Sequence, residues 1–203
     1  MKTDDEPRRQ PWQLALELAT LDHLSNGRVI LGAGLGVPGD FSKFGFSPDT
    51  KLRAAKLDEA LEIITGLWSG TSFSYEGEHY TISDIELPII PLQKPRIPIL
   101  LAGWWPNKNP FKRGARWDGI MPYWESLPKS IPEDELRGAI DYYTAQGGSG
   151  GEIVIPYYSD ISTEFAKLCK DVNISWLLAC GFQEKGKFTL DMDRIIEGPP
   201  LID

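Results

Sequence analysis

Apolar residues recur at helical spacing in several stretches of the chain. Leucines at positions 14, 18, 21 and 24 fall on one face of a helix predicted from Pro11 to Leu24. A stronger stripe runs from Leu57 to Trp68, after a start signal at Pro48-Asp49 and before Gly70. Further helices are predicted near 110–116, from a capping box at 130–133 to the glycines at 147–148, and at 162–171 and 191–197.

Five short apolar runs separate these helices, at 28–33, 97–102, 117–123, 152–158 and 174–179. They lack polar alternation, which is typical of parallel strands buried on both faces. The aromatic-rich segment 72–82 has Glu76-Gly77 at its centre and predicts a surface β-hairpin. Because helices and strands alternate from end to end, we predict an α/β fold with a parallel sheet, as one domain over 1–203.

The composition excludes several classes of partner. The 203 residues include 29 acidic and 21 basic side chains, and the net charge of −8 repels nucleic-acid backbones and anionic lipids. No run approaches the ~20 apolar residues that span a bilayer, and the first residues lack the apolar core of a signal peptide. Cys169 and Cys180 lie on different predicted elements without C-x-x-C spacing. We therefore expect reduced, buried thiols in a cytoplasmic protein with no nucleic-acid or membrane partner.

Glycines follow the first predicted strand. Gly34, Gly36 and Gly39 spell G-x-G-x-x-G, the pattern of a dinucleotide-binding turn, which requires a helix that begins within the glycines. Segment 40–48 has no helical stripe, so the predicted helix starts about ten residues too late, and we reject that interpretation. A glycine loop at the carboxyl end of a parallel strand is then either a ligand contact or a plain tight turn, and the spacing leaves both open.

Several segments together resemble the luciferase-like flavin-dependent monooxygenases and their deazaflavin-dependent relatives. They are PWQLALELATLDHLSNGRVILGAGLG, KLDEALEIITGLWSG with Arg53 just before it, YEGEHYTI, PRIPILLAG, RWDGIMPY, ISWLLA and DRIIEGPP. Their order matches the family from about Arg8 to Pro200.

The resemblance implies a (β/α)8 TIM barrel of bacterial luciferase type. In that fold, reduced flavin sits at the C-terminal mouth and either activates oxygen or exchanges hydride. Family members carry three further strands upstream, so we predict a partial barrel with about five parallel strands and the hairpin as an insertion. An incomplete barrel leaves open sheet edges and an uncovered apolar interior, so we also expect a homo-oligomer.

The resemblance also assigns site residues. The glycine loop aligns with the family loop whose backbone contacts the cofactor. The next strand ends in a small residue beside two tryptophans, which either line an apolar pocket or pack on a neighbour. We predict cofactor contacts at Ala33, Gly34, Leu35, Gly36 and Gly103, and substrate contacts at Trp104 and Trp176.

Other polar residues are weaker candidates. Arg53, at a helix start, predicts either a contact with an anion or carboxylate or an ordinary surface position. Asp118, at the start of a strand, is interpreted as a structural turn. His23 and His79 lack metal-ligand spacing, so we expect no metal site. The family often has Trp-Trp-Leu-Glu where this chain ends its last strand in alanine, at position 179, so a carboxylate is absent there.

Two functional hypotheses follow. The first is a flavin-dependent oxidoreductase or monooxygenase that acts on a small organic substrate with reduced FMN or, as a variant, a deazaflavin coenzyme. The second is a truncated, non-catalytic paralogue or fragment that acts as a flavin-binding or subunit-interaction module. The absent upstream strands and Ala179 favour the second.

Overall fold

The computed structural model describes residues 9–36, 38–125, 131–157, 161–179, 182–184 and 187–189. The chain divides into two compact units, Met1–Pro98 and Ile99–Asp203. All five predicted strands are present, one in the first unit and four in the second, whereas the helix predicted at 191–197 lies outside the described residues. A single domain over 1–203 stays a prediction. In the described part of the chain, none of the helices has both the length and the apolar character of a membrane span.

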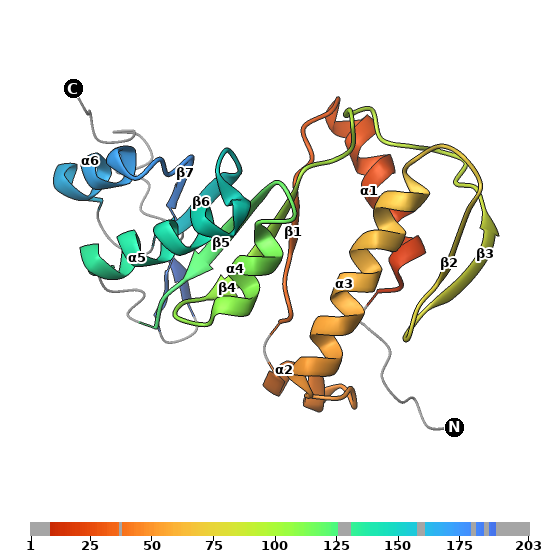
Figure 1. Cartoon of the computed structure of the whole chain (residues 1–203), viewed down its shortest axis with the longest axis horizontal. Coiled ribbons are helices and arrows are strands. Elements are labelled where there is room, and N and C mark those ends of the chain that lie inside the picture. Colours follow the sequence, from red (N-terminus) through yellow and green to blue (C-terminus); the bar gives the residue numbers. More distant parts are fainter. Residues whose placement is uncertain are drawn as a thin grey trace. The chain divides into compact units, whose positions relative to one another are not determined.

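Two long helices frame the first unit (Figure 1). α1 (Pro11–Ser25) has a proline in its first turn and ends where Asn26 adopts a left-handed conformation. α3 (Thr50–Leu67) begins after Asp49, whose carboxylate accepts hydrogen bonds from the backbone N–H groups of residues 51 and 52. The helices pack together, and the Trp68 indole N–H donates to the Ala15 carbonyl at 2.9 Å. The predicted bounds of both helices are therefore close to the observed ones.

The buried face of α1 differs from the predicted leucine stripe. Leu21 and Leu24 are 50% and 79% exposed, whereas Ala15, Ala19 and Asp22 are fully buried. The Trp68 indole at the end of α3 contacts this face of α1 through the Ala15 carbonyl. Helical spacing alone predicted that the leucines of α1 are buried. Packing on α3 buries a different face of the helix instead.

The glycine loop leads into a short helix that the sequence analysis did not predict. β1 (Leu31–Ala33) is followed by α2 (Pro38–Lys43), so the predicted gap of ten residues is wrong. The Phe41 ring on α2 lies 4.4 Å from the Arg53 guanidinium and 6.3 Å from the Phe46 ring. These tertiary contacts stabilise α2 without an apolar stripe. The rejection of a dinucleotide-binding unit has other support, because the chain passes from α3 into an antiparallel hairpin rather than a parallel strand.

A buried carboxylate joins α1 to the segment that follows the hairpin. Asp22 accepts hydrogen bonds from the Gln93 backbone N–H at 3.0 Å and from the Gln93 side-chain amide at 2.8 Å. The same amide donates to the Val29 carbonyl at 2.7 Å. Burial is the largest single influence and raises the pKa of Asp22, but the hydrogen bonds from Gln93 and from the backbone at Leu92 and Val29 together leave the pKa below its ordinary value.

Replacing Asp22 with asparagine is expected to lower the free energy of unfolding at about pH 7 by about 1–3 kcal/mol, because an amide NH₂ would face the Gln93 donors. The pKa of Asp22 is depressed in the folded state, so its contribution is complete above the unfolded-state pKa of about 4 and is lost as pH falls through the folded-state pKa. Urea denaturation of both proteins should show that the difference between their free energies of unfolding is smaller at about pH 3 than at about pH 7. A free-energy difference of equal size at both pH values would contradict the role of the Asp22 charge.

Parallel strands and helices alternate in the second unit. The strands β4 (Ile99–Trp104), β5 (Gly119–Tyr123), β6 (Glu152–Tyr157) and β7 (Trp176–Ala179) lie side by side in this order. The connecting helices are α4 (Lys108–Gly114), α5 (Glu133–Tyr143), which a π-helical turn at Thr144–Gly148 extends, and α6 (Thr163–Asp171). A short antiparallel pair that was not predicted follows, β8 (Phe182–Glu184) with β9 (Lys187–Thr189).

The start of α5 differs from the predicted capping box. The helix begins after Pro132, which makes no side-chain cap, and the predicted cap at Ser130 lies outside the described residues.

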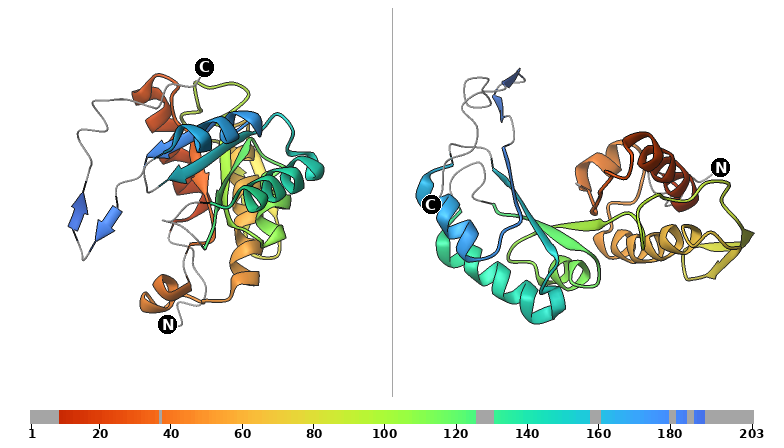
Figure 2. Two further views of the ribbon diagram at one scale, coloured as in Figure 1. Left: turned by 90° about the vertical axis from the view of Figure 1, so that its left-hand side faces the viewer. Right: turned by 90° about the horizontal axis from the view of Figure 1, so that it is seen from above.

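The two faces of the β4–β7 sheet have different surroundings. One face carries Ile120, Ile153 and Ile155 and is buried under α4, α5 and α6, which lie together on that side (Figure 2). Side chains alternate along a strand, so the opposite face carries Trp104 and Trp176, which are 57% and 54% exposed. The prediction of strands buried on both faces is therefore wrong at these positions. A sheet with helices on its outer side alone is the wall of a (β/α) barrel.

Candidate ligand-binding site

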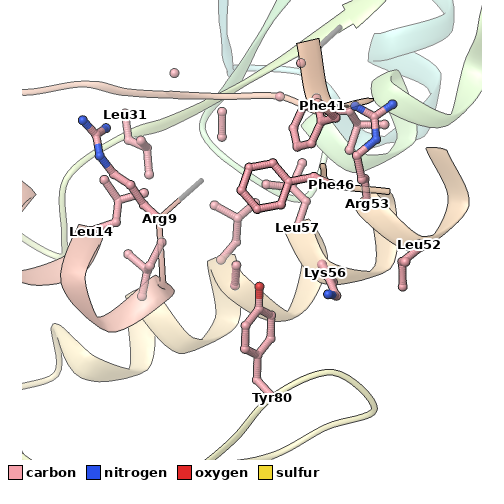
Figure 3. A pocket seen from close by; sticks show the side chains of 18 of the residues that line it. Arg9, Leu14, Leu31, Phe41, Phe46, Leu52, Arg53, Lys56, Leu57 and Tyr80 are labelled. Carbon is pink, nitrogen blue, oxygen red and sulfur yellow. Dashed lines mark hydrogen bonds between the residues drawn. The ribbon is translucent and has the colours of Figure 1, made fainter. Parts of the chain in front are cut away.

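A pocket in the first unit lies against the glycine loop, α3 and the hairpin turn (Figure 3). Its volume of about 320 Å³ is at the lower end of the range for small-molecule sites. Residues 32–36 form one wall, so the structure brings the predicted Ala33, Gly34, Leu35 and Gly36 to a common cavity. The other apolar lining residues are Leu14, Leu31, Phe41, Phe46, Leu52, Leu57, Ala60, Leu61 and Ile64. The polar ones are Arg9, Ser47, Arg53, Lys56 and Tyr80, and none of the described lining residues is acidic.

Gly36 closes the loop in a conformation that suits glycine. Its φ of +67° is in the left-handed region, and a Cβ at this position would lie 2.7 Å from the Phe41 ring. The loop backbone can therefore pass close to Phe41, which is also part of the pocket wall.

Arg53 connects α3 to the glycine loop. Its side chain is 8% exposed, and Nη1 donates to the Leu35 carbonyl at 2.7 Å while the guanidinium stacks on the Phe41 ring. The alternative of an ordinary surface position is wrong because Arg53 is buried, whereas a contact with an anion or carboxylate stays a prediction. A second guanidinium nitrogen, Nη2, donates to the Thr50 hydroxyl at 3.4 Å. Its Nε is buried and has no hydrogen-bond partner. An unpaired buried donor is costly, because burial removes its hydrogen bonds to water.

Tyr80 enters the pocket from the hairpin formed by β2 (Phe73–Glu76) and β3 (Thr81–Ile85). The Glu59 carboxylate on α3 accepts hydrogen bonds from the backbone N–H groups of residues 78–80, at 2.9–3.2 Å. A Cβ on Gly77 would collide with that carboxylate, so glycine allows the turn to approach α3. This arrangement fixes the turn and directs the Tyr80 hydroxyl toward the middle of the lining side chains (Figure 3).

The Tyr80 hydroxyl is buried and unpaired. The side chain is 8% exposed, and its Oη has no hydrogen-bond partner. Burial, with a smaller contribution from the Glu59 charge, raises the pKa of Tyr80 to about 12, so the hydroxyl stays protonated at neutral pH. Two residues of the pocket lining, Tyr80 and Arg53, thus each hold a buried donor without a hydrogen-bond partner.

The remaining predicted site residues belong to the second unit. Gly103 is buried where β4 meets α4, and a Cβ there would collide with Pro110, which explains the glycine by packing. Trp104 at the end of β4 packs on Tyr123, with ring centroids 5.7 Å apart. Trp176 begins β7, and its indole N–H donates to the Glu152 carboxylate at 3.0 Å. The two tryptophans share a sheet face but lie on non-adjacent strands. Their assignment to substrate, and that of Gly103 to cofactor, stays a prediction.

Other predicted roles are structural in the described residues. The Asp118 carboxylate accepts a hydrogen bond from the Ile99 backbone N–H at 2.7 Å, a structural contact between the starts of β4 and β5. His23 Nε2 pairs with the Ile90 carbonyl at 2.9 Å. Cys169 is buried on α6, where burial raises the pKa of its thiol to about 12, and Cys180 lies outside the described residues.

Sequence reasoning missed most of the pocket. Tyr80 was noted only as a hairpin aromatic, and Phe41, Phe46 and Lys56 were not singled out. One signal was present in the sequence, because the apolar Tyr80 and Ile82 alternate with Thr81, as on a strand with one buried face. In the structure both side chains face inward and are 8% exposed. The burial of Arg53 had no sequence signal, because it depends on a loop 18 residues earlier.

Sequence comparison identifies the family. The model of a family described as luciferase-like monooxygenase matches residues 6–146, more than half of the chain. The chain belongs to the luciferase-like monooxygenase family. The resemblance inferred from the sequence segments is thereby confirmed.

Relatives of this luciferase-like chain include proteins of known and unknown activity. An F420-dependent glucose-6-phosphate dehydrogenase of Kineococcus radiotolerans is 35% identical over 115 residues, 56% of this chain and 33% of the relative. An uncharacterized protein of Mycobacterium tuberculosis is 36% identical over 143 residues, 69% of this chain and 48% of the relative. The chain thus spans about half or less of the length of these relatives.

Solved structures of other luciferase-like proteins share the fold. The monooxygenase RslO1 of Streptomyces bottropensis has a TM-score of 0.62 at 22% identity, over 81% of this chain and 50% of that one. The oxygenating constituent of 3,6-diketocamphane monooxygenase of Pseudomonas putida, in complex with FMN, has a TM-score of 0.61 at 18% identity, over 81% and 49%. The predicted fold, an α/β partial (β/α)8 barrel of luciferase type with an inserted hairpin, is confirmed.

Proposed function

We propose that this luciferase-like chain is part of an oxidoreductase that uses a reduced flavin, with FMN as the first candidate and a deazaflavin coenzyme as the variant. One observation carries the proposal: Ala33–Gly36, assigned to the cofactor by resemblance, form a wall of a pocket that is otherwise apolar and basic. Basic lining residues stand out in a chain with a net charge of −8. The names of relatives that use F420 or contain FMN add support.

The pocket residues have chemistry that suits a flavin. A loop with two glycines lets the backbone approach a flat ring, and Leu57 and Phe46 supply apolar contact area. Arg53 and Lys56 in the pocket lining carry donor groups that match a ring carbonyl or ring nitrogen, both of which accept hydrogen bonds. The positive charge of the Arg53 guanidinium favours a reduced, anionic flavin, because a cation stabilises a nearby anion.

Each part of the site has a physical task in such a reaction. A bound reduced flavin supplies the electrons for hydride transfer or for oxygen activation. The loop at 33–36 would hold the cofactor through backbone groups, and the bond from Arg53 to the Leu35 carbonyl keeps that loop in place. The apolar side chains on α3 exclude water, which strengthens electrostatic interactions with the ligand. The organic substrate is expected to be small, because a flavin ring would occupy much of a cavity of about 320 Å³.

Flavin titration tests this function directly. The purified chain, titrated with FMN and separately with coenzyme F420, is expected to quench or shift the flavin signal with a Kd of about 1–50 μM. Absence of binding of both compounds at about 100 μM would contradict the proposal. A flavin bound by the chain and then reduced by dithionite should be reoxidised by oxygen or an organic acceptor at a rate that differs from free flavin.

A flavin-binding or subunit-interaction module without catalysis is the second candidate. Ala179 favours it, because the end of β7 carries no carboxylate that could move a proton. Flavin binding with a reoxidation rate equal to that of free flavin would support this candidate. The expected homo-oligomer stays a prediction that size-exclusion chromatography with light scattering would test.

A further inference from the structure

The face of the β4–β7 sheet that lies opposite the helices carries large apolar side chains in contact with solvent. Trp104, Trp176 and Leu178 on this face are 57%, 54% and 40% exposed. Single exposed apolar residues are common, but a group of them on one surface is typical of a protein interaction site. We call this surface the open sheet face.

The strand register aligns side chains of the open sheet face in a row. Trp104 pairs with Tyr123 on β5, and Leu178 pairs with Pro156 on β6. Because β5 and β6 are also in register, these four residues form one row near the carboxyl ends of four adjacent strands. The Trp104 and Tyr123 rings lie in contact, with centroids 5.7 Å apart. Tryptophan and tyrosine are the most frequent anchors of protein interfaces.

Charge permits two copies of the chain to meet at the open sheet face. Each copy has a net charge of −8, so two copies repel one another at long range. Among the described residues that β4–β7 place on this face, Glu152 alone is charged, and its carboxylate accepts a hydrogen bond from the Trp176 indole. A twofold axis perpendicular to the strands sets the two sheets antiparallel and puts the two Glu152 side chains at opposite ends of the interface. The contact therefore adds no close pair of like charges.

The distribution of bulk on the open sheet face also fits a second copy. Trp104 and Tyr123 stand at the carboxyl ends of β4 and β5, whereas the smaller Ala102 and Gly119 stand closer to the amino ends. In the antiparallel arrangement, the aromatic row of one copy faces the small residues of the other. Packed sheet faces interdigitate in this way, at about 10 Å between the sheets.

The size of the open sheet face predicts a weak dimer. Four strands at about 4.8 Å spacing, with about five residues each at about 3.3 Å, cover about 300 Å² in plan. Two such faces together bury roughly 600–1,000 Å², less than the roughly 1,200 Å² of a stable complex. We therefore expect reversible association rather than a permanent dimer.

We propose that two copies of this chain associate through the open sheet face, with Trp104 and Trp176 as the anchors of the interface. The proposal gives a surface to the expected homo-oligomer. Neither tryptophan lines the pocket at the glycine loop, so the inference is independent of the proposed flavin function.

Sedimentation equilibrium of the full 203-residue chain tests the association. Between about 1 and 500 μM the chain is expected to pass from monomer to dimer, with a Kd of about 10–100 μM. Raising NaCl from about 20 to 300 mM should lower the Kd about two- to fivefold, because salt screens the repulsion between two negative copies. A monomer at all concentrations would overturn the inference. Weaker association at high salt would also overturn it, because ion pairs would then hold the copies together.

The same substitution at two exposed leucines tests the location of the interface. Leu178→Glu is expected to raise the Kd at least tenfold, because a twofold contact buries the new charge on both copies. Leu24→Glu is the matched control, since Leu24 is 79% exposed on α1 in the first unit, and its Kd should stay within about twofold of wild type. Circular dichroism checks that both variants fold. A tenfold effect of Leu24→Glu, or none of Leu178→Glu, would overturn the inference.

Fluorine NMR locates the contact without a destabilising substitution. The chain has seven tryptophans, so 5-fluorotryptophan labelling gives one signal for each, assigned by single Trp→Phe variants. Across the Kd, the signals of Trp104 and Trp176 are expected to shift with protein concentration, while that of the buried Trp68 in the first unit stays fixed. Fixed signals of Trp104 and Trp176 during dimerisation would place the interface elsewhere and overturn the inference, even where Leu178→Glu fails to fold.

The outcomes of these experiments are separate from those of the flavin titration. If FMN binds and the chain stays monomeric, the flavin function stands and the inference fails. If the chain dimerises through the open sheet face while FMN and F420 do not bind, the inference stands and the flavin function fails.

Discussion

Replacing Ile120 with alanine should lower the free energy of unfolding by about 2–5 kcal/mol. Ile120 is fully buried, on the face of β5 that packs on the helices, and its register partners are Leu101 on β4 and Ile153 on β6. The truncation removes apolar contact area and leaves a cavity between the sheet and the helices, which rigid neighbours cannot refill. Urea denaturation followed by far-ultraviolet circular dichroism measures the change.

Leu178→Ala is the control on the opposite face of the same sheet. Leu178 is 40% exposed and pairs with Pro156, so its truncation should cost less than about 1 kcal/mol. Comparing the losses of stability in Ile120→Ala and Leu178→Ala tests whether the β4–β7 sheet has one face covered by helices and one open face. Similar losses in both variants would contradict it.

Replacing Gly36 with alanine is expected to weaken FMN binding at least tenfold. An L residue in the left-handed region costs about 1–2 kcal/mol, and the new Cβ would lie 2.7 Å from the Phe41 ring. The ring must then shift, which disturbs its contact with the Arg53 guanidinium at 4.4 Å. Because both residues line the pocket, the binding surface changes as well as the loop. Titration with FMN, monitored by flavin fluorescence, measures the loss.

Gly39→Ala is the matched control for this prediction. Gly39 lies in α2, outside the pocket lining, and no heavy atom stands within 4 Å of a Cβ built on it. Alanine is the better helix former by about 1 kcal/mol, so this variant should fold at least as well as wild type. Its Kd for FMN should be unchanged. Equal Kd values for Gly36→Ala and wild type would argue that the loop does not contact the flavin.

Local sequence patterns predicted much of the fold, because helix caps, apolar stripes and turns depend on residues close together in the chain. The capping carboxylate of Asp49, the stripe through Leu61 and Ile64 on α3, and the turn at Gly77 all agree with the structure. The α1 face was wrong because spacing ranks leucine above alanine, whereas close packing on α3 places Ala15 and Ala19 inside. α2 was missed because its stability comes from Phe41 on Arg53 rather than from periodicity.

The sequence by itself determined the order of the five parallel strands and the longer helices, the α/β class, the family and the glycine loop as a candidate contact. These follow from spacing, turn residues and short segments, which need no knowledge of distant neighbours. Only the tertiary structure decided that Arg53 is buried against the Leu35 carbonyl and that Glu59 holds the hairpin turn. It also decided that two buried donors, on Arg53 and Tyr80, have no hydrogen-bond partner. Burial and hydrogen-bond satisfaction depend on residues that are far apart in the chain, and no local pattern encodes them.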